Sequence, residues 1–376
     1  MKRALDGVRV VEFSSFTAGP LCGELLAQLG AEVVKIEPPG GDHLRSLAVQ
    51  FGGVSYLYHI NNAGKRSVVA DLKQPDGRQV AFDLAADADV VLENFAPGTL
   101  ERYGLGYEDI SRESPQIIYC SVNGFGRTGP LRKERAYDVV TQGLAGVISL
   151  TGHEARRPVK VGPSIVDMMG AVVGASSIIA ALLHRRRTGE GQAVELAMYD
   201  VATWLTAEAW PVLMSGNVPE PIGCRSRSIA WQGVFATRDG YVALAAVSAT
   251  QREALQHMVT LVGDDHSEDE LTAAAHSWCG ARMTADVVAS GRGAGIVAAP
   301  VLSVNDVAVH PQFVDRGIVV EMNDCRGRRG PTLGTAFRMT ETPGVPYGFA
   351  EPLGASTEHI LAELKVQKSG PRADRA

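Results

Sequence analysis

The segment "VRVVEFSSFTAGPLCGELLAQLGAEVVKIEPPGGD", residues 8–42, indicates the fold class of the chain. Its first apolar run, 8–13, predicts a strand, and the segment 21–30 predicts a helix that ends at Gly30. A second strand is predicted over 31–40, where acidic and turn residues end the apolar run. A strand, a turn, a helix and another strand form the opening unit of a parallel α/β sheet.

The same alternation continues along the first half of the chain. Strands are predicted at 66–72, 89–95 and 116–126, with a helix over 75–88 between the first two. Strands that alternate with helices indicate a Rossmann-like, doubly wound parallel sheet covered by helices on both faces. We therefore expect an α/β fold for this part of the chain.

The pattern changes after about residue 200. The segment 233–247 predicts two strands around an Arg-Asp-Gly turn, and helical stretches follow it, which indicates a smaller α+β domain. The polar tail from residue 367 is expected to be disordered. The expected division is a large discontinuous domain at 1–200 and 335–376, a small domain at 218–316, and linkers at 201–217 and 317–334.

The opening unit resembles a dinucleotide-binding motif, in which an acid after the second strand, here Glu37, holds a ribose hydroxyl. The glycines disagree with this interpretation, because no GxGxxG can be written on the first turn, which holds Gly19, Pro20 and Gly23. Pro20 suits the first turn of a helix, and the backbone N–H groups of residues 17–19 could still hold an anion there. Nicotinamide or flavin binding is therefore disfavoured.

Composition excludes several classes of protein. The 376-residue chain has a formal net charge of −6, and its basic residues are spread out apart from the cluster at 185–187, so nucleic acid is not an expected partner. The five cysteines are widely spaced and form no metal-site pattern. The amino terminus lacks the apolar core of a secretory signal. We expect a reduced, cytoplasmic protein without a metal.

One segment, 165–183, is long and apolar enough to resemble a membrane span. Asp167 and two serines argue against that interpretation, and no second span follows. We expect a buried helix instead, in which Gly170, Gly174 and Ala175 allow another backbone to come close. From the residues alone, Asp167 could be a helix cap or a group that carries out chemistry.

Several segments together resemble class III CoA-transferases, the CaiB/BaiF group. They occur in register from about residue 6 to 365 and comprise 10–42, "NAGKRSVVADLK", "LENFAPGTLERYGLGY", "YCSVNGFGRTGP", "AYDVVTQGLAGV", 161–200, "APVLSV" and "EPLGASTEHIL". The resemblance implies a two-domain chain that forms an interlocked homodimer, with coenzyme A bound at the dimer interface. It also implies transfer of CoA from an acyl-CoA to a free carboxylic acid, with acyl-CoA as a substrate and no permanently bound cofactor.

The resemblance assigns the catalytic aspartate to Asp167. Its carboxylate would attack the thioester carbonyl to give a mixed anhydride, and the released thiolate would return to form an enzyme–CoA thioester. We expect the helix dipole and the free N–H groups at the helix start to keep Asp167 ionised. The same donors could stabilise an oxyanion.

The resemblance also places CoA contacts. The loop after the first strand, expected to touch CoA and form the oxyanion site, supplies Ser15, Phe16, Thr17 and Ala18; Ser15 and Thr17 differ from the His and Gln of one family member. Phosphate or cofactor contacts are assigned to Lys73, Asn94, Phe95, Arg102 and Arg135. A surface charge is the alternative for Arg102 and Arg135, and core packing is the alternative for Phe95.

Two departures from the family pattern refine the activity. Racemases of this group carry a histidine where this chain has Tyr137, next to Asp138, and a phenol is a poor base at neutral pH. The glycine run with which some formyl-CoA transferases close the active site is absent from 224–240. Trp231, Arg225 and Arg227 could line an acceptor pocket, although a buried tryptophan and two surface arginines are the simpler interpretation.

The sequence therefore predicts a CoA-transferase acting on a dicarboxylyl-CoA or another short acyl-CoA. An acyl-CoA racemase or isomerase on the same scaffold is the first alternative, and a catalytically silent CoA-binding protein is the second. A nicotinamide oxidoreductase is the most distant one.

Overall fold

The computed structural model describes residues 3–47, 49–153, 157–227, 231–261, 266–324, 326–345 and 347–369. The chain divides into two compact units. Unit 1 comprises Met1–Ala145, Gly162–Trp204 and Val314–Ala376, and unit 2 comprises Gly146–Val161 and Leu205–Phe313. The last helix, α15 (Thr357–Ser369), includes the first residues of the tail that was expected to be disordered, and the rest of that tail lies outside the described residues.

The sheet of unit 1 has six parallel strands in the order β5-β2-β1-β6-β7-β8. This confirms the predicted Rossmann-like parallel sheet. The strands are β1 (Arg9–Phe13), β2 (Glu32–Glu37), β5 (Arg66–Val69), β6 (Val90–Glu93), β7 (Ile118–Asn123) and β8 (Gln192–Ala197). The last of them, β8, was not predicted, because its short run beside Gly191 and Glu190 carries a weak apolar signal.

Helix α1 (Ala18–Gln28) begins three residues before the predicted start at residue 21. Pro20 therefore lies in its first turn, as the sequence suggested. A proline is tolerated there because an N–H group at this position would have no partner within the helix. The early start places the amino end of α1 directly after the loop that follows β1.

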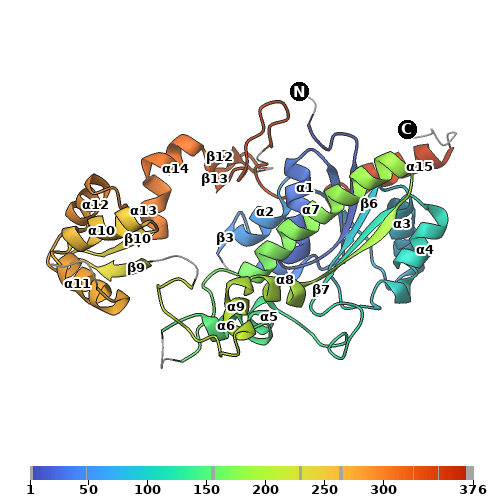
Figure 1. Cartoon of the computed structure of the whole chain (residues 1–376). Helices are drawn as coiled ribbons and strands as arrows, with labels where there is room; N and C mark the ends of the chain where they lie inside the picture. The colour runs from blue at the N-terminus through green and yellow to red at the C-terminus, as the bar shows by residue number, and fades with distance from the viewer. Residues whose placement is uncertain are drawn as a thin grey trace. The chain divides into compact units, whose positions relative to one another are not determined.

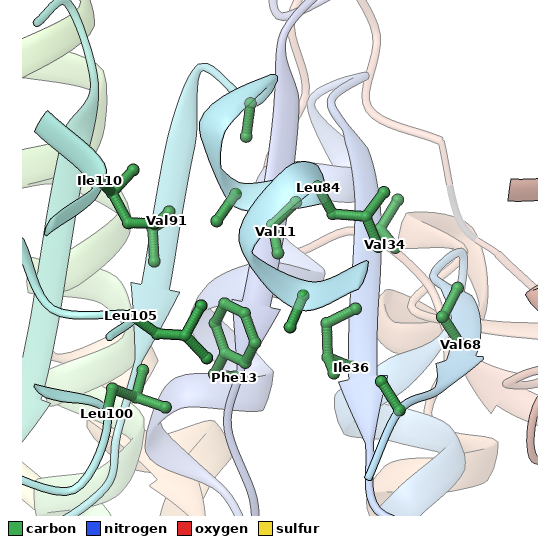
Figure 2. Close-up of a cluster of buried hydrophobic side chains, with 14 of the residues drawn as sticks. Val11, Phe13, Val34, Ile36, Val68, Leu84, Val91, Leu100, Leu105 and Ile110 are labelled. Atoms are coloured by element: carbon green, nitrogen blue, oxygen red, sulfur yellow. The ribbon is translucent and has the colours of Figure 1, made fainter. Parts of the chain in front are cut away.

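Alternate residues of the strands face opposite sides of the sheet. Val11 and Phe13 belong to the core cluster of Figure 2, together with Leu84 of α3 (Pro75–Ala86) and Ile110 of α4 (Tyr107–Glu113). Helix α15 adds Ile360 and Leu364 to the same cluster. The opposite side of β1 carries Val10 and Glu12, and α1 covers that side. The sheet is therefore covered on both faces.

Helix α7 (Ile165–Thr188) packs along α1 (Figure 1). It is the helix of the described part of the chain that meets the length and composition of a membrane span. Its buried side is rich in small residues, as expected: the Sγ atom of Cys22 lies 3.2 Å from where a Cβ atom on Gly174 would stand. A larger residue at Gly174 would therefore push the two helices apart.

Shorter elements complete unit 1. The helical ones are η1 (His43–Ser46), α2 (Tyr56–Asn62), η2 (Glu101–Tyr103), α5 (Asp138–Leu144) and α8 (Met198–Trp204). The hairpins are β3–β4 (Gln50–Phe51, Val54–Ser55) and β12–β13 (Val319–Asn323, Arg329–Leu333), the second of which lies within the segment expected as a linker. Helix α14 (Pro311–Arg316) spans the border between the two units.

Unit 2 is an α+β unit around an antiparallel sheet in the order β11-β10-β9. The strands β9 (Trp231–Ala236) and β10 (Tyr241–Ala246) form the predicted pair around the Arg-Asp-Gly turn, and β11 is Val297–Pro300. The helices are α6 (Val147–Leu150), η3 (Ala207–Ala209), α9 (Trp210–Met214), α10 (Ala249–Met258), α11 (Glu268–Gly280), α12 (Thr284–Gly293) and α13 (Val304–Val309). The expected small domain, 218–316, overlaps this unit.

Candidate active site

The candidate site lies at the carboxyl edge of the parallel sheet. The connection from β1 leads to β2 on one side, whereas β6 lies on the other side of β1, so the strand order reverses between β1 and β6. Ligands bind in parallel sheets at such reversal points, outside the carboxyl ends of the strands. The loop of residues 14–17 follows β1 there, and Asn94 follows β6.

Asn94 holds this loop through both ends of its side-chain amide. Its Oδ1 accepts from the backbone N–H of Ser15 at 2.9 Å, and its Nδ2 donates to the carbonyl of Ser15 at 2.8 Å. A Cβ atom at Gly19 would lie 2.9 Å from Cγ of Asn94 and 2.7 Å from Cβ of Ser14, so only glycine fits between them. Asn94 was predicted to contact CoA; in the structure its side-chain amide shapes the loop.

Phe16 has a backbone φ of 64°, a left-handed conformation that is unusual for a bulky residue. The Nδ2 of Asn61, on α2, donates to the Phe16 carbonyl at 3.2 Å. The ring of Phe16 meets the ring of Tyr137 edge to face at 5.9 Å and lies 6.4 Å from the ring of His43. These contacts connect the loop after β1 with the segment that leads into α5.

The amino end of α1 is open. No described residue accepts a hydrogen bond from the N–H groups of Phe16, Thr17, Ala18 or Gly19, and the side chain of Thr17 does not cap the helix. Unpaired N–H groups at a helix start attract negative charge. The predicted loop of residues 15–18 thus presents backbone donors whatever side chains it carries.

Asp167 lies in the first turn of α7, whose N–H groups are already occupied. Oδ1 of Asp138 accepts from the N–H of Val166 at 2.9 Å and from that of Asp167 at 3.4 Å. Oδ2 of Asp138 accepts from Nε2 of Gln142 at 2.6 Å. Asp138, the first residue of α5, therefore caps α7 from another part of the chain.

Burial, and after it the Asp138 carboxylate, raise the pKa of Asp167 to about 7. The expectation that the helix start keeps Asp167 fully ionised is therefore wrong. The N–H groups that would have stabilised its charge bind Asp138 instead, and Asp138 adds a like charge nearby. The Asp167 carboxylate is partly protonated at neutral pH.

The basic residues predicted to contact CoA share one edge of the sheet. Lys73, Arg102 and Arg135 follow β5, β6 and β7, and all three are exposed. No ion pair or hydrogen bond joins their side-chain nitrogens to another described residue, so their charges are open to an anionic ligand. Phe95 packs against the core cluster that contains Val11 and Phe13, which agrees with its alternative interpretation.

Glu37 is the acid that suggested ribose binding. Both of its carboxylate oxygens accept hydrogen bonds from other residues of this chain. It is ion-paired with Arg45 at 2.6 Å, accepts from the hydroxyls of Ser67 and Tyr58, and is buried. Burial opposes its ionisation, but the hydrogen bonds and charge of Arg45 lower its pKa to about 2. Glu37 therefore has no free oxygen for a nucleotide.

A set of buried charges beneath the loop was not predicted from the sequence. Glu12, Lys35 and Lys65 have no more than 3% of their surface exposed. Glu12 and Lys35 lie within the strands β1 and β2, next to apolar neighbours, and a charge within such a run is a signal that could have identified them. Lys65 stands just before β5.

The residues proposed for an acceptor pocket lie in unit 2. Trp231 is buried, donates to Thr272 through its indole N–H at 3.2 Å and stacks on Phe235, so it is part of the core. Arg225 pairs with Asp269 at 3.4 Å and lines a cavity of about 490 Å³, whereas Arg227 donates to the carbonyl of Glu220. Arg225 is the one of the three that lines this cavity.

Comparison with known proteins decides the family. A sequence model described as CoA-transferase family III matches residues 5–357. The chain belongs to this family. The residues of the candidate site, from the loop after β1 to Asp167, all lie within the matched range, and the chain is a CoA-transferase.

Relatives of family III resemble the chain over almost its whole length. The succinate–glutarate CoA-transferase of Agrobacterium fabrum is 34% identical, covering 97% of this chain and 96% of the relative. The succinyl-CoA:mesaconate CoA-transferase of Haloarcula marismortui is 33% identical, with 99% of each chain covered. The crystal structure of a CaiB/BaiF family protein from Brucella suis has a TM-score of 0.86 at 33% identity, covering 97% of this chain and 100% of that one.

Proposed function

We propose that Asp167 is the nucleophile of a CoA transfer from a dicarboxylyl-CoA to a free dicarboxylic acid. The observation that carries this proposal is the environment of Asp167. Asp167 is partly buried in the first turn of α7, and its backbone N–H donates to Asp138. The adjacent residue Tyr137 contacts Phe16, in the loop with open N–H groups. A carboxylate linked through this segment to a loop whose backbone donors no described residue accepts suits attack on a carbonyl that becomes an oxyanion.

The reaction needs four displacements and no redox step. The Asp167 oxygen attacks the thioester carbonyl and the C–S bond breaks, which gives an acyl–aspartyl anhydride and CoA thiolate. The thiolate attacks the aspartyl carbonyl of the anhydride, and the donor acid leaves. The acceptor carboxylate then displaces the thiolate from the aspartyl thioester, and the thiolate attacks the acceptor's acyl carbonyl to restore free Asp167.

The negative charge of the CoA phosphates matches the basic residues at the carboxyl edge of the sheet. Lys73, Arg102 and Arg135 offer exposed cations for the phosphates of CoA, as the resemblance implied. The relatives named above use succinyl-CoA or succinate with glutarate or mesaconate. We take succinyl-CoA as the first donor to test, and glutarate and mesaconate as the first acceptors.

We also propose that the chain acts as a homodimer. One side of α7 is exposed and apolar, with Met168, Val172, Ile179 and Leu183 at helical spacing. Such a side on a central helix is typical of a surface that a second copy covers. Light scattering at micromolar concentration tests this, and a monomeric mass would contradict it.

The function is tested by intact-protein mass spectrometry after incubation with succinyl-CoA. Trapping with hydroxylamine or borohydride should modify the wild-type protein at Asp167 and leave Asp167→Ala unmodified. Asp286→Asn, which removes an aspartate at the equivalent position of helix α12, is the matched control and should be modified at Asp167 like the wild type. Exchange of an α-proton without an acceptor acid, and no adduct, would support the racemase instead.

A further inference from the structure

A buried ionic cluster lies beneath the loop that follows β1. It consists of Glu12, Lys35 and Lys65, which are 0%, 1% and 3% exposed. The Glu12 carboxylate pairs with Lys35 at 3.0 Å and with Lys65 at 2.7 Å. Asp42 balances the second positive charge through a 3.3 Å pair with Lys35.

Both ammonium groups also bind backbone carbonyls, one in the loop and one in the first turn of α1. Nζ of Lys35 donates to the Ser14 carbonyl at 2.8 Å, and Nζ of Lys65 donates to the Pro20 carbonyl at 2.6 Å. The Ser14 hydroxyl donates to Oε1 of Glu12 at 2.6 Å. The cluster therefore holds the two ends of the segment 14–20.

The carbonyls within the segment are held as well, by Asn94 at Ser15 and by Asn61 at Phe16. The carbonyl of one residue and the N–H of the next point in opposite directions across a trans peptide plane, and the chain has no cis peptide among its described residues. Fixing these carbonyls inward turns the N–H groups of Phe16 and Thr17 outward. The directions of these two N–H groups thus depend on the contacts of Asn94 and Asn61, within a segment whose two ends the cluster holds.

The chain makes room for this cluster. A Cβ atom at Gly23 would lie 2.0 Å from Oε2 of Glu12, so the carboxylate occupies the space that a side chain would need. Replacing buried ion pairs by apolar residues is often neutral or stabilising, but apolar residues could not donate to the carbonyls of Ser14 and Pro20. Burial lowers the pKa of Lys65 to about 8, so the ammonium persists at neutral pH.

We propose that Glu12, Lys35 and Lys65 are positioning residues that aim the N–H groups of residues 16–19 at the reacting thioester. This inference rests on the proposed function. The three side chains touch neither substrate nor the reacting atoms and act through the loop backbone. Removing the cluster should lower the rate of the chemical step and leave the affinity for acyl-CoA nearly unchanged.

The test uses Lys65→Met and the double variant Glu12→Gln with Lys65→Met. The double variant keeps the buried charges balanced, because the Lys35–Asp42 pair remains, and so it should fold even if the single variant does not. For each variant, kcat is normalised to the fraction of Asp167 that can be trapped. This kcat should fall on the order of 100-fold, as for the loss of an oxyanion donor, and KM should stay within about threefold of wild type. Arg9→Met removes pairs with Glu32 and Asp87 at the other end of β1 and should leave kcat unchanged.

Hydrogen exchange separates this inference from the proposed function. Peptides covering 14–24 contain the bonded amides of Ser15 and Leu21, and these should exchange at least about tenfold faster in the double variant, while 118–123 stays unchanged. Unchanged exchange at 14–24, an unchanged kcat, or an equal loss in Arg9→Met would overturn the inference. A wild-type protein without transferase activity would overturn only the proposed function, because the exchange comparison still decides the positioning role.

Discussion

Helices α1 and α7 pack along each other in unit 1, but their amino ends are built in opposite ways. At α1 the N–H groups of residues 16–19 have no acceptor among the described residues. The carbonyls of Ser14 and Phe16, in the loop before it, accept hydrogen bonds from side chains. At α7 the corresponding N–H groups of Val166 and Asp167 are taken by the Asp138 carboxylate. One helix start is left for a ligand, and the other is filled by the protein.

This difference shows that a helix dipole does not by itself set the charge of a nearby carboxylate. At α7 the N–H groups donate to Asp138. They therefore do not stabilise the Asp167 carboxylate, which also has Asp138 as a like-charged neighbour. At α1 the donors remain free for charge that develops on a substrate.

The largest effect is expected for Asp167→Asn at the filled helix start. Removing the nucleophile should lower the transfer rate by at least about 10⁴-fold. Because the pKa of Asp167 is raised to about 7 in the folded protein, the wild type loses stability as pH rises from about 4 through 7. Asn carries no such charge, so this variant should be more stable than wild type at pH 8, by about 2 kcal/mol, and similar to it near pH 4.

Activity with succinyl-CoA and denaturant unfolding at pH 4.5 and pH 8 measure these two effects. Asp286→Asn, at the matching position of α12, should change neither the activity nor the pH dependence of stability. An Asp167→Asn variant that is destabilised at pH 8 would show that the carboxylate is stabilised where it lies, contrary to the raised pKa.

Gly19→Ala adds a methyl group in the first turn of α1, at the open helix start. The new methyl group would collide with Ser14 and Asn94, at 2.7 and 2.9 Å, and displace the Asn94 amide from the loop that it shapes. We expect a loss of stability of about 2 kcal/mol and a fall in kcat of about 10- to 100-fold. Gly98→Ala is a control in the same unit, where a Cβ atom meets nothing within 4 Å and the positive φ adds only local strain. Equal kcat losses in both would point to a general loss of folding.

Asp138→Asn makes the filled helix start less acidic while keeping an oxygen that accepts from Val166. Without the like charge the pKa of Asp167 should fall, so more of the nucleophile is ionised at acidic pH. From pH 8 to pH 6, kcat/KM should therefore fall less in the variant than in the wild type. The variant's kcat/KM relative to wild type should be at least about threefold higher at pH 6 than at pH 8. A pH profile identical to that of the wild type would remove Asp138 as a cause of the raised pKa.

Much of unit 1 could be predicted because its signals are local. The strand 8–13, the strand 31–40 and the helix at 165–183 follow from apolar periodicity and turn residues. The strand β8 was missed for lack of such a signal. The motifs that resemble family III identified the family, because their order along the chain is specific even where each motif is weak.

The site was less predictable because its decisive contacts are distant in sequence. Asp138 caps α7 across 28 residues, and Lys65 reaches the Pro20 carbonyl across 45. Local reasoning about the start of α7 therefore predicted an ionised Asp167. At Glu37 the glycine pattern already disfavoured nucleotide binding, but the ion pair with Arg45 could not be predicted from the sequence. Competition between partners for one donor or acceptor cannot be counted before the fold is known.

The smallest effect is expected for Thr17→Ala at the open helix start. A threonine at this position usually caps its helix, and its loss costs about 1 kcal/mol. The Thr17 hydroxyl makes no such bond, so we expect a change below about 0.5 kcal/mol and a kcat within about threefold of wild type. Ser55→Ala is the comparison within the same unit, because Ser55 does cap α2 through the N–H of Tyr58. If the two variants were equally destabilised, the Thr17 hydroxyl would occupy the donors of α1 in solution, and the contrast between the two helix starts would disappear.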